Sequence, residues 1–132
     1  MSDTVATFWI ISKQGEVFEL GDSPKPRKKE LAFKLTEENY NSWGYITIQI
    51  KGVSYSKNRV LLNDHFVGYL DPTPNDIWVE QTLIVEVYDK QLFGDGPTNK
   101  LVIESNNHTG GSDGNLDDFS FKHVIFHYRT NR

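Results

Sequence analysis

The sequence contains no cysteine, which excludes disulfide bonds, thiolate metal sites and a cysteine nucleophile. It has no apolar stretch of the length that a membrane-spanning helix requires. Basic residues are few, 14 against 18 acidic ones, and the net charge of −4 opposes binding to the phosphate backbone of nucleic acids. Residues 1–7 lack the basic start, apolar run and cleavage site of a signal peptide. We therefore expect no nucleic-acid or membrane partner, and a cytoplasmic location by default, or export by a route without a cleaved signal.

Aromatic residues are abundant, with three Trp, six Tyr and eight Phe among 132 residues. A chain of this length is usually one domain and can bury a sizeable core without disulfides. Large rings supply much of the buried area of such a core, and an exposed ring offers a flat apolar surface to a ligand. We expect a single domain over residues 1–132.

Short β-prone segments separated by turn residues recur along the chain. The clearest covers residues 45–51, where Ile46, Ile48 and Ile50 alternate with polar or aromatic residues. A period of two with a branched apolar face predicts a half-buried strand. Further strands are predicted at residues 5–12, 16–20, 30–35, 59–63, 65–70, 78–87, 101–104 and 119–129.

Turn residues between these segments predict hairpins. The pair Asn63-Asp64 predicts one between the strands on either side of it, and residues 13–15 predict another near the N-terminus. Residues 119–129 are apolar on both faces, as expected of a central strand. Analogy with known sandwich folds, rather than any pattern in this sequence, leads us to expect that the two terminal strands pair in one sheet. Single helical turns are predicted at residues 36–41 and 88–93. Many short strands with almost no helix indicate an all-β fold, a two-sheet antiparallel β-sandwich of the jelly-roll type.

No catalytic constellation is evident. His123 and His127 are four residues apart on a predicted strand, which separates them by about 13 Å and prevents them from sharing one metal ion. The adjacent carboxylates Asp117 and Asp118 would point to opposite faces, so they cannot form the acid–base pair of a glycosidase. The sequence therefore indicates a binding module rather than an enzyme, with a small hydrolase as the least favoured alternative.

Residues 106–115 form a polar, glycine-rich segment, and loops on a rigid β scaffold often carry binding sites. A sugar requires hydrogen-bonding groups of this kind beside an aromatic ring. The candidate ligand-binding residues are Asn107, His108, Asp113 and Asn115, with Trp43 and Trp78 as stacking rings. The alternative is a surface loop without a ligand and two buried Trp side chains.

Residues 113–118 carry side-chain oxygens at alternating positions, like the start of a calcium-binding loop. The helix–loop–helix calcium motif is excluded, because Asp118 stands where that motif needs Gly and Val124 where it needs a bidentate Glu. A different hard-cation site remains open, with oxygens from Asp117 or Asp118. The alternative is that these side chains cap backbone groups in a tight loop.

Several of these segments resemble galactose-binding-like jelly rolls, including family 6 carbohydrate-binding modules. The likeness lies in residues 78–85, in Gly96, in residues 99–103, and in the run Asn115-Leu116-Asp117 that leads into the last strand. The segment 60–68 is also similar to a hairpin of sugar-binding jelly rolls attached to glycosidases, although Asp64 replaces the usual Gly. Together the likeness covers roughly residues 58–128.

This resemblance implies a site as well as a fold. Asn115 corresponds to a loop Asn that bonds a sugar hydroxyl, and Trp78 to a stacking residue. Asp117 matches a position that often helps to hold a structural calcium ion, with an acidic N-terminal partner. That partner would be one or more of Glu16, Glu19, Asp22 and Glu30, of which we take Asp22 and Glu30, with Asp117, as candidate metal ligands.

The resemblance implies a non-catalytic, lectin-like carbohydrate-binding module, with or without a structural calcium ion. The alternative function is that of a structural or assembly protein, such as a phage, virion or secretion-apparatus component, whose sandwich contacts a protein partner or forms a homo-oligomer. The absence of cysteines and of a signal peptide is compatible with both functions.

Overall fold

A computed structural model describes residues 4–34, 43–86, 98–106 and 115–131. This part of the chain contains nine β-strands: β1 (Thr4–Ile10), β2 (Val17–Leu20), β3 (Lys28–Phe33), β4 (Trp43–Lys51), β5 (Arg59–Leu62), β6 (His65–Tyr69), β7 (Val79–Glu86), β8 (Asn99–Glu104) and β9 (Phe119–Asn131). The helical turns predicted at residues 36–41 and 88–93 lie outside the described residues. Among those described, no helix is long and apolar enough to cross a membrane.

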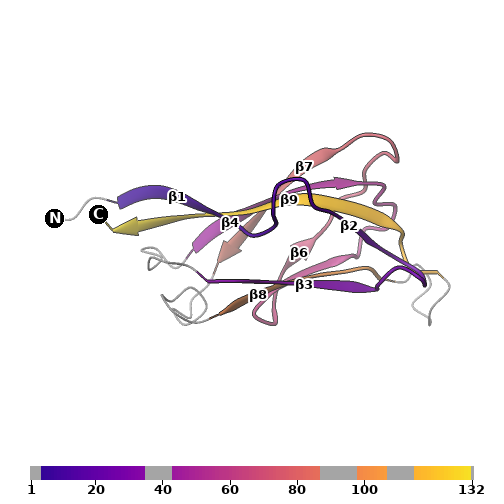
Figure 1. The fold of residues 1–132 in the computed structure, drawn as a ribbon, viewed down its shortest axis with the longest axis horizontal. Coiled ribbons are helices and arrows are strands. Elements are labelled where there is room, and N and C mark those ends of the chain that lie inside the picture. Colours follow the sequence, from indigo (N-terminus) through magenta and orange to yellow (C-terminus); the bar gives the residue numbers. More distant parts are fainter. Residues whose placement is uncertain (1–3, 35–42, 87–97, 107–114, 132) are drawn as a thin grey trace.

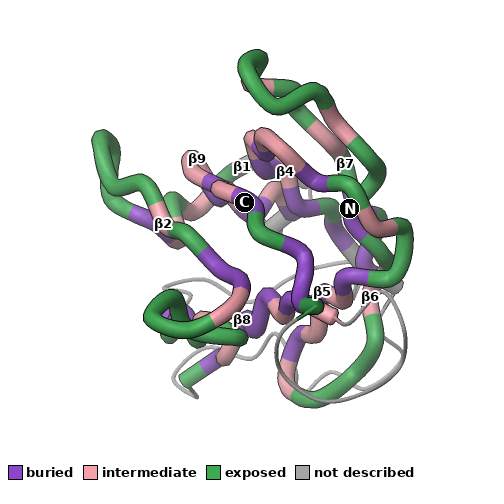
Figure 2. Tube along the Cα trace, turned by 90° about the vertical axis from the view of Figure 1, so that its right-hand side faces the viewer, coloured by how far each residue is buried: buried purple, intermediate pink, exposed green. Residues whose placement is uncertain are grey.

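The strands form two sheets that pack face to face (Figure 1). A five-stranded sheet has the order β1-β9-β4-β7, with β2 also pairing with β9, and a four-stranded sheet has the order β3-β8-β5-β6. Every pair of neighbouring strands is antiparallel. Figure 2 shows the layers end on, with β4, β7 and β9 in one and β5, β6 and β8 in the other. The predicted all-β, two-sheet antiparallel sandwich is confirmed.

The core lies between the two sheets and follows the alternation predicted for β4. Ile46, Ile48 and Ile50 are at most 1% exposed, and burial of each such side chain contributes about 1.5–3 kcal/mol of hydrophobic free energy. The other core residues are Leu20, Leu31, Phe33, Val53, Val60, Leu62, Leu70, Leu83, Val85, Leu101, Ile103, Phe119, Phe121, Val124, Phe126 and Tyr128.

The last strand, β9, lies in the middle of the five-stranded sheet, as its apolar residues predicted. However, β9 does not bury both faces along its whole length. Phe119 and Phe121 are buried in its first half, and Val124 and Phe126 in its second. The buried positions therefore change from odd to even residue numbers within one strand.

A β-bulge causes this change. Thr47 and Gln49 are two residues apart on β4, but their partners Ile125 and Lys122 are three residues apart on β9. His123 occupies the bulge with a φ of 51°, in the left-handed region that bulges often require. The extra residue shifts the alternation by one position, so odd-numbered side chains point into the core before the bulge and even-numbered ones after it. The sequence therefore looks apolar on both faces although the strand buries only one.

The predicted N-terminal hairpin is wrong. Both β1 and β2 pair with β9, residues 4–10 with its second half and residues 17–20 with its first. After the short turn that follows β1, the chain pairs with β9 again as β2. Residues of this turn are held against β9, because Ile11 N and Ser12 N donate to Val124 O and Ser12 Oγ accepts from Val124 N. The bulge in β9 exposes these backbone groups, and the turn after β1 satisfies them.

The predicted β5–β6 hairpin is confirmed. Asn63 and Asp64 have φ angles of 49° and 68°, the pattern of a type I′ turn. Asn63 fixes this turn to the neighbouring strand, since Asn63 Oδ1 accepts from Lys100 N at 2.8 Å and Asn63 Nδ2 donates to Asn99 Oδ1 at 3.0 Å. Asp64 adopts the left-handed conformation that Gly provides in similar hairpins.

Candidate ligand-binding face

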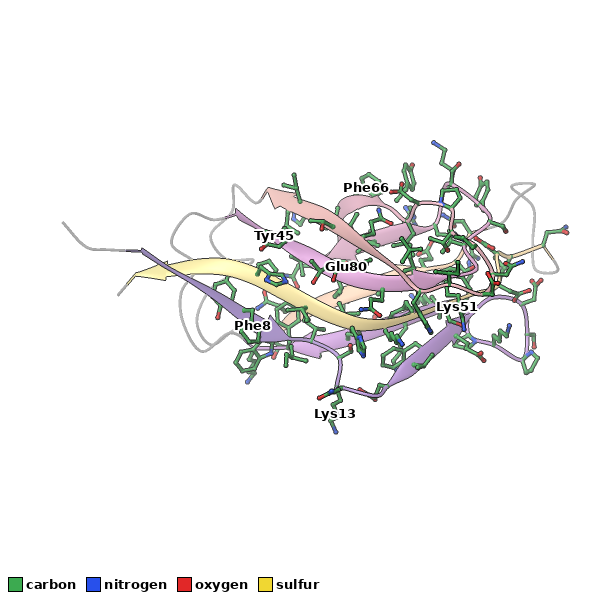
Figure 3. All side chains as sticks on the ribbon, turned by 90° about the horizontal axis from the view of Figure 1, so that it is seen from above. Phe8, Lys13, Tyr45, Lys51, Phe66 and Glu80 are labelled. Atoms are coloured by element: carbon green, nitrogen blue, oxygen red, sulfur yellow. The ribbon has the colours of Figure 1, made fainter. Side chains whose placement is uncertain are left out.

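The five-stranded sheet turns one side away from the core, and we call this side the outer face. Because Ile46, Ile48 and Ile50 point into the core, the alternate residues of β4 and their cross-strand partners point outward. The outer face consists of Phe8, Ile10, Tyr45, Thr47, Gln49, Lys51, Trp78, Glu80, Thr82, Ile84, Lys122, Ile125 and His127. Figure 3 looks onto it, with Phe8 and Tyr45 toward one end, Glu80 near the middle and Lys51 toward the other end.

Apolar and aromatic side chains form a row across one end of the outer face. Phe8, His127, Tyr45 and Ile84 are successive cross-strand partners on β1, β9, β4 and β7. The exposed fractions are 59% for Phe8, 37% for Tyr45 and 66% for Ile84. The His127 ring lies parallel to that of Tyr45, with centroids 4.5 Å apart, and 6.5 Å from that of Phe8. This row is an apolar platform open to solvent.

His127 is the polar centre of this platform. Its Nε2 lies 3.0 Å from Thr47 Oγ1. Partial burial lowers the pKa of His127 below its ordinary value of 6.5, and the negative charge of Glu80 acts in the opposite direction. At neutral pH the imidazole is therefore uncharged, with one nitrogen as donor and the other as acceptor.

A shallow depression of about 230 Å³ lies next to the platform. It is lined by Ile10, Ser12, Gln14, Gln49, Glu80, His123 and Ile125. The bulge at His123 and the turn that follows β1 shape one side of it, since both insert residues where regular pairing would leave a flat sheet. Amide, carboxylate and imidazole groups thus converge on a concave patch with apolar walls.

The opposite end of the outer face carries Trp78 and two lysines. Lys51 of β4 and Lys122 of β9 place their Nζ atoms 4.7 Å and 4.2 Å from the centroid of the Trp78 ring. Such cation–π contacts hold both ammonium groups over the indole. Trp78 is only half-buried, so the alternative that it belongs to the core is wrong.

The other candidate ligand-binding residues are not gathered on this face. The side chain of Trp43, together with Asn107, His108 and Asp113, lies outside the described part of the structure. Asn115 is exposed in the connection that leads to β9. The ligand-binding role of these residues stays a prediction.

The candidate metal ligand Asp117 has a structural environment. It is 1% exposed, and its carboxylate accepts hydrogen bonds from Ser54 N, Ser54 Oγ, Tyr55 N and Asn58 Nδ2 at 2.7–3.0 Å. These donors belong to the segment between β4 and β5, which Asp117 ties to the start of β9. The arrangement matches the capping alternative raised for this segment.

The other two candidate metal ligands have partners as well. Asp22 Oδ1 accepts from Leu116 N at 3.1 Å, and a Glu30 carboxylate oxygen lies 3.7 Å from Lys100 Nζ. Among the described residues, no group of three or more His, Asp or Glu side chains is placed to hold a metal ion. A calcium site formed by Asp22, Glu30 and Asp117 stays a prediction.

Most residues of the outer face were not found from the sequence. The alternation of residues 45–51 separated Tyr45, Thr47 and Gln49 from the core isoleucines, and Trp78 was predicted as a stacking ring. These two signals pointed to this face. Phe8, Glu80 and His127 join them only through strand pairing between distant segments, which a single strand pattern does not reveal.

Comparison with known proteins gives a likeness in fold only. No protein-family model and no curated protein sequence matches the chain. A solved structure of a mutant of CBM29-2, from a study of ligand recognition by family 29 carbohydrate-binding modules, is similar at 16% identity with a TM-score of 0.51, over 93% of this chain and 86% of that one. Another mutant of CBM29-2, complexed with cellulohexaose, is similar at 13% identity with a TM-score of 0.44, over 92% and 91% of the two chains.

The chain therefore has the β-sandwich fold of carbohydrate-binding modules. The structure that is similar with a TM-score of 0.51 is a family 29 module, so the expected likeness is shown at the level of this fold and is not shown for family 6 in particular.

Proposed function

We propose that this chain is a non-catalytic carbohydrate-binding module that holds a glycan along the outer face of its five-stranded sheet. The observation that carries the proposal is the combination, on one rigid sheet, of an exposed aromatic row at Phe8 and Tyr45, a polar depression at Gln49 and Glu80, and a second aromatic ring at Trp78. The fold likeness to a family 29 carbohydrate-binding module supports the same function.

The chemistry of the outer face suits a sugar. One side of a pyranose ring exposes C–H groups that pack on an aromatic ring, and its edge carries hydroxyls that need both donors and acceptors. Tyr45 and Phe8 provide the apolar surface, while Gln49, Glu80 and neutral His127 provide donors and acceptors beside it. An aromatic row alone would suit many apolar ligands, so the adjacent polar depression favours a glycan.

The dimensions of the face favour a chain of several sugars. Lys51, which contacts Trp78, is six positions after Tyr45 on β4, and strand geometry makes the distance between them about 20 Å. A single sugar ring would reach one end of the face only. An extended oligosaccharide would contact the aromatic row, the depression and Trp78 together.

The depression also favours binding over hydrolysis. Cleavage of a glycosidic bond generally requires two carboxyl groups on opposite sides of that bond. The residues that line the depression include one carboxylate, that of Glu80. A single carboxylate is suited to accept hydrogen bonds from sugar hydroxyls.

Binding to a panel of soluble polysaccharides, measured by affinity electrophoresis and then by calorimetry, tests the proposal. We expect Tyr45→Ala to weaken glycan binding at least about tenfold, since truncation of an aromatic anchor costs more than 1 kcal/mol. Phe66→Ala is the matched control, because Phe66 is 53% exposed but lies on β6 of the four-stranded sheet. Binding that is lost in Phe66→Ala and retained in Tyr45→Ala would move the site to the other sheet.

Failure of the whole panel would reject the proposal. If, in that case, light scattering detects a stable oligomer that Ile84→Asp disrupts, the exposed apolar residues of the outer face serve protein contacts instead. That outcome would favour the structural or assembly function.

A further inference from the structure

We infer that the glycan is acidic, and that Lys51 and Lys122 bind an anionic substituent of a sugar ring beside Trp78. This inference rests on the proposed glycan-binding function of the outer face and adds the class of ligand. An anionic substituent here means a carboxylate, as in a uronic acid, or a sulfate ester.

The first observation is the convergence of two ammonium groups from different strands. Lys51 extends from β4 and Lys122 from β9, the next strand over, yet both Nζ atoms lie within cation–π distance of the one Trp78 ring, at 4.7 Å and 4.2 Å. Because β4 lies between β9 and β7, the side chains of Lys122 and Trp78 meet over β4. The indole therefore positions two positive charges at a single place on the face.

The second observation is that no ion pair with another described residue neutralises these charges. Within the described residues the ion pairs involve Lys25, Arg59 and Lys100, and no carboxylate lies within 4.0 Å of Lys51 or Lys122 Nζ. Two like charges held close together repel each other. An anion bound between them would remove that repulsion and gain two charge-assisted hydrogen bonds.

Negative and positive charges lie at different places on the outer face. Glu80 and Gln49 are cross-strand partners in the depression. Lys122 is the partner of Gln49 on the other side, so its backbone is level with that of Glu80, while its Nζ extends to the Trp78 ring. A carboxylate on the ligand would be repelled at Glu80 and attracted to the two Nζ atoms over Trp78, which lies beside Lys51; Lys51 is further along the face than Glu80 (Figure 3). We therefore place neutral, hydroxyl-rich parts of the glycan at the depression and its anionic substituent at Trp78.

This distribution of charge also favours an acidic glycan over a nucleic acid as the ligand. The chain carries a net charge of −4, and the Glu80 carboxylate lies on the same face as the lysines. A nucleic acid presents a phosphate at every step along its length, so it would meet Glu80 wherever it met the lysines. A glycan with one anionic group, by contrast, brings its charge to Lys51 and Lys122 while its neutral, hydroxyl-rich part lies at the depression.

Matched ligands test the inference directly. The probes are two glycans in which single acidic sugars are separated by neutral ones, a glucuronic-acid-substituted xylan and a glucuronic-acid-substituted arabinogalactan, each beside its carboxyl-reduced form, which keeps the rings and loses the charge. Carrageenan provides the sulfate arm. We expect the acidic form of at least one probe to bind at least about tenfold more tightly than its neutral counterpart at low salt, and added salt to weaken the acidic form selectively. Binding to carrageenan alone would identify sulfate as the substituent.

Charge variants assign the preference to the two lysines. The double variant of Lys51→Gln and Lys122→Gln should bind the acidic and neutral forms equally, while the double variant of Lys51→Arg and Lys122→Arg should retain the preference. Lys28→Gln, an exposed lysine on β3 of the other sheet, is the control for net charge. A thermal unfolding midpoint near that of the wild type verifies the fold of each variant.

The two proposals fail in different ways. Equal binding of acidic and neutral forms by the wild type, with both lost in Tyr45→Ala, would overturn the acidic specificity and leave the glycan-binding face intact. A preference for acidic forms that persists in the double Gln variant would also overturn it. Absence of binding to acidic and neutral forms alike would overturn both proposals.

Discussion

The imidazole of His127 stacks on the ring of Tyr45, with centroids 4.5 Å apart and planes 8° from parallel. The two residues are cross-strand partners on β9 and β4. Their side chains support each other in a fixed orientation, which is the property that a stacking platform for a ligand requires. The stack also withdraws the imidazole from water and so affects its protonation.

The first prediction concerns the protonation of His127. Because burial disfavours the charged form, its pKa should lie below 6.5, and Glu80→Gln should lower it further by removal of the opposing negative charge. An NMR titration of the His Cε1 protons, assigned with a His127→Gln variant, measures both values. A His127 pKa at or above 6.5, or one that Glu80→Gln raises, would contradict the prediction.

This shift has a consequence for stability. A lowered pKa in the folded state means that the unfolded chain binds more protons in the pH range between the folded pKa and 6.5. The contribution of His127 to stability is therefore fully present above pH 6.5 and is lost as the pH falls through that range. We expect His127→Gln to reduce the slope of unfolding free energy against pH in this range.

The second prediction concerns the buried carboxylate of Asp117. Asp117→Ala removes a carboxylate that accepts hydrogen bonds from the partly buried segment of Ser54 and Tyr55 and from the buried Asn58, and a buried donor left without an acceptor costs about 1–3 kcal/mol. We expect a loss of at least about 3 kcal/mol in urea unfolding, with the exposed Asp76→Ala as control.

The same variant tests the calcium site that the sequence predicted. If Asp117 acts through hydrogen bonds alone, the loss of stability should be equal with excess calcium and with chelator. Calcium that raises the wild-type unfolding midpoint and has no effect on Asp117→Ala would instead support a bound ion.

The third prediction concerns Gly44 at the start of β4, which pairs with Tyr128 of β9. A Cβ at this position would clash with His127 O and lie 2.8 Å from Cε1 of the buried Phe126 ring. Because a backbone oxygen cannot move away cheaply, we expect Gly44→Ala to destabilise the fold by about 1–3 kcal/mol.

Gly68→Ala is the matched control for Gly44→Ala. Its Cβ would meet only Leu83 Cδ2, at 3.0 Å, and the end of a leucine side chain can rotate away. Equal losses of stability for the two variants would show that the close approach of β4 and β9 is not responsible.

The fourth prediction concerns Asp64 in the β5–β6 turn. With a φ of 68° it adopts a conformation that Gly reaches without strain, and Asn-Gly is a preferred pair in type I′ turns. Its ion pair with Lys100, at 4.0 Å on an exposed side chain, contributes little. We expect Asp64→Gly to raise the unfolding free energy by about 0.5–1 kcal/mol, whereas a decrease would indicate that the ion pair or the side chain matters more than the strain.

Several elements could be predicted from the sequence because their signals are local. The alternation around Ile46, Ile48 and Ile50 identified β4 and its buried side, and the pair Asn63-Asp64 identified a hairpin. A period of two and a turn pair depend on residues within a few positions of one another. The number and spacing of such segments were also sufficient to predict an all-β sandwich.

Other features depend on contacts between distant residues. The turn after β1 was taken for a hairpin because nothing local shows that β2 returns to β9, and the bulge at His123 made a strand with one buried face look buried on both. The oxygen-rich segment before β9 suggested a cation, whereas the carboxylate of Asp117 accepts hydrogen bonds from the segment after β4.

The sequence by itself determined which segments are strands, which side of β4 is buried, and the fold class. Only the tertiary structure decided which strands are neighbours, and hence that Phe8, Tyr45, Glu80 and His127 share one face with Trp78 and the two lysines that contact its ring. The physical reason is that side-chain alternation is imposed by the backbone of each strand alone, whereas the order of strands in a sheet is set by the burial of the whole core.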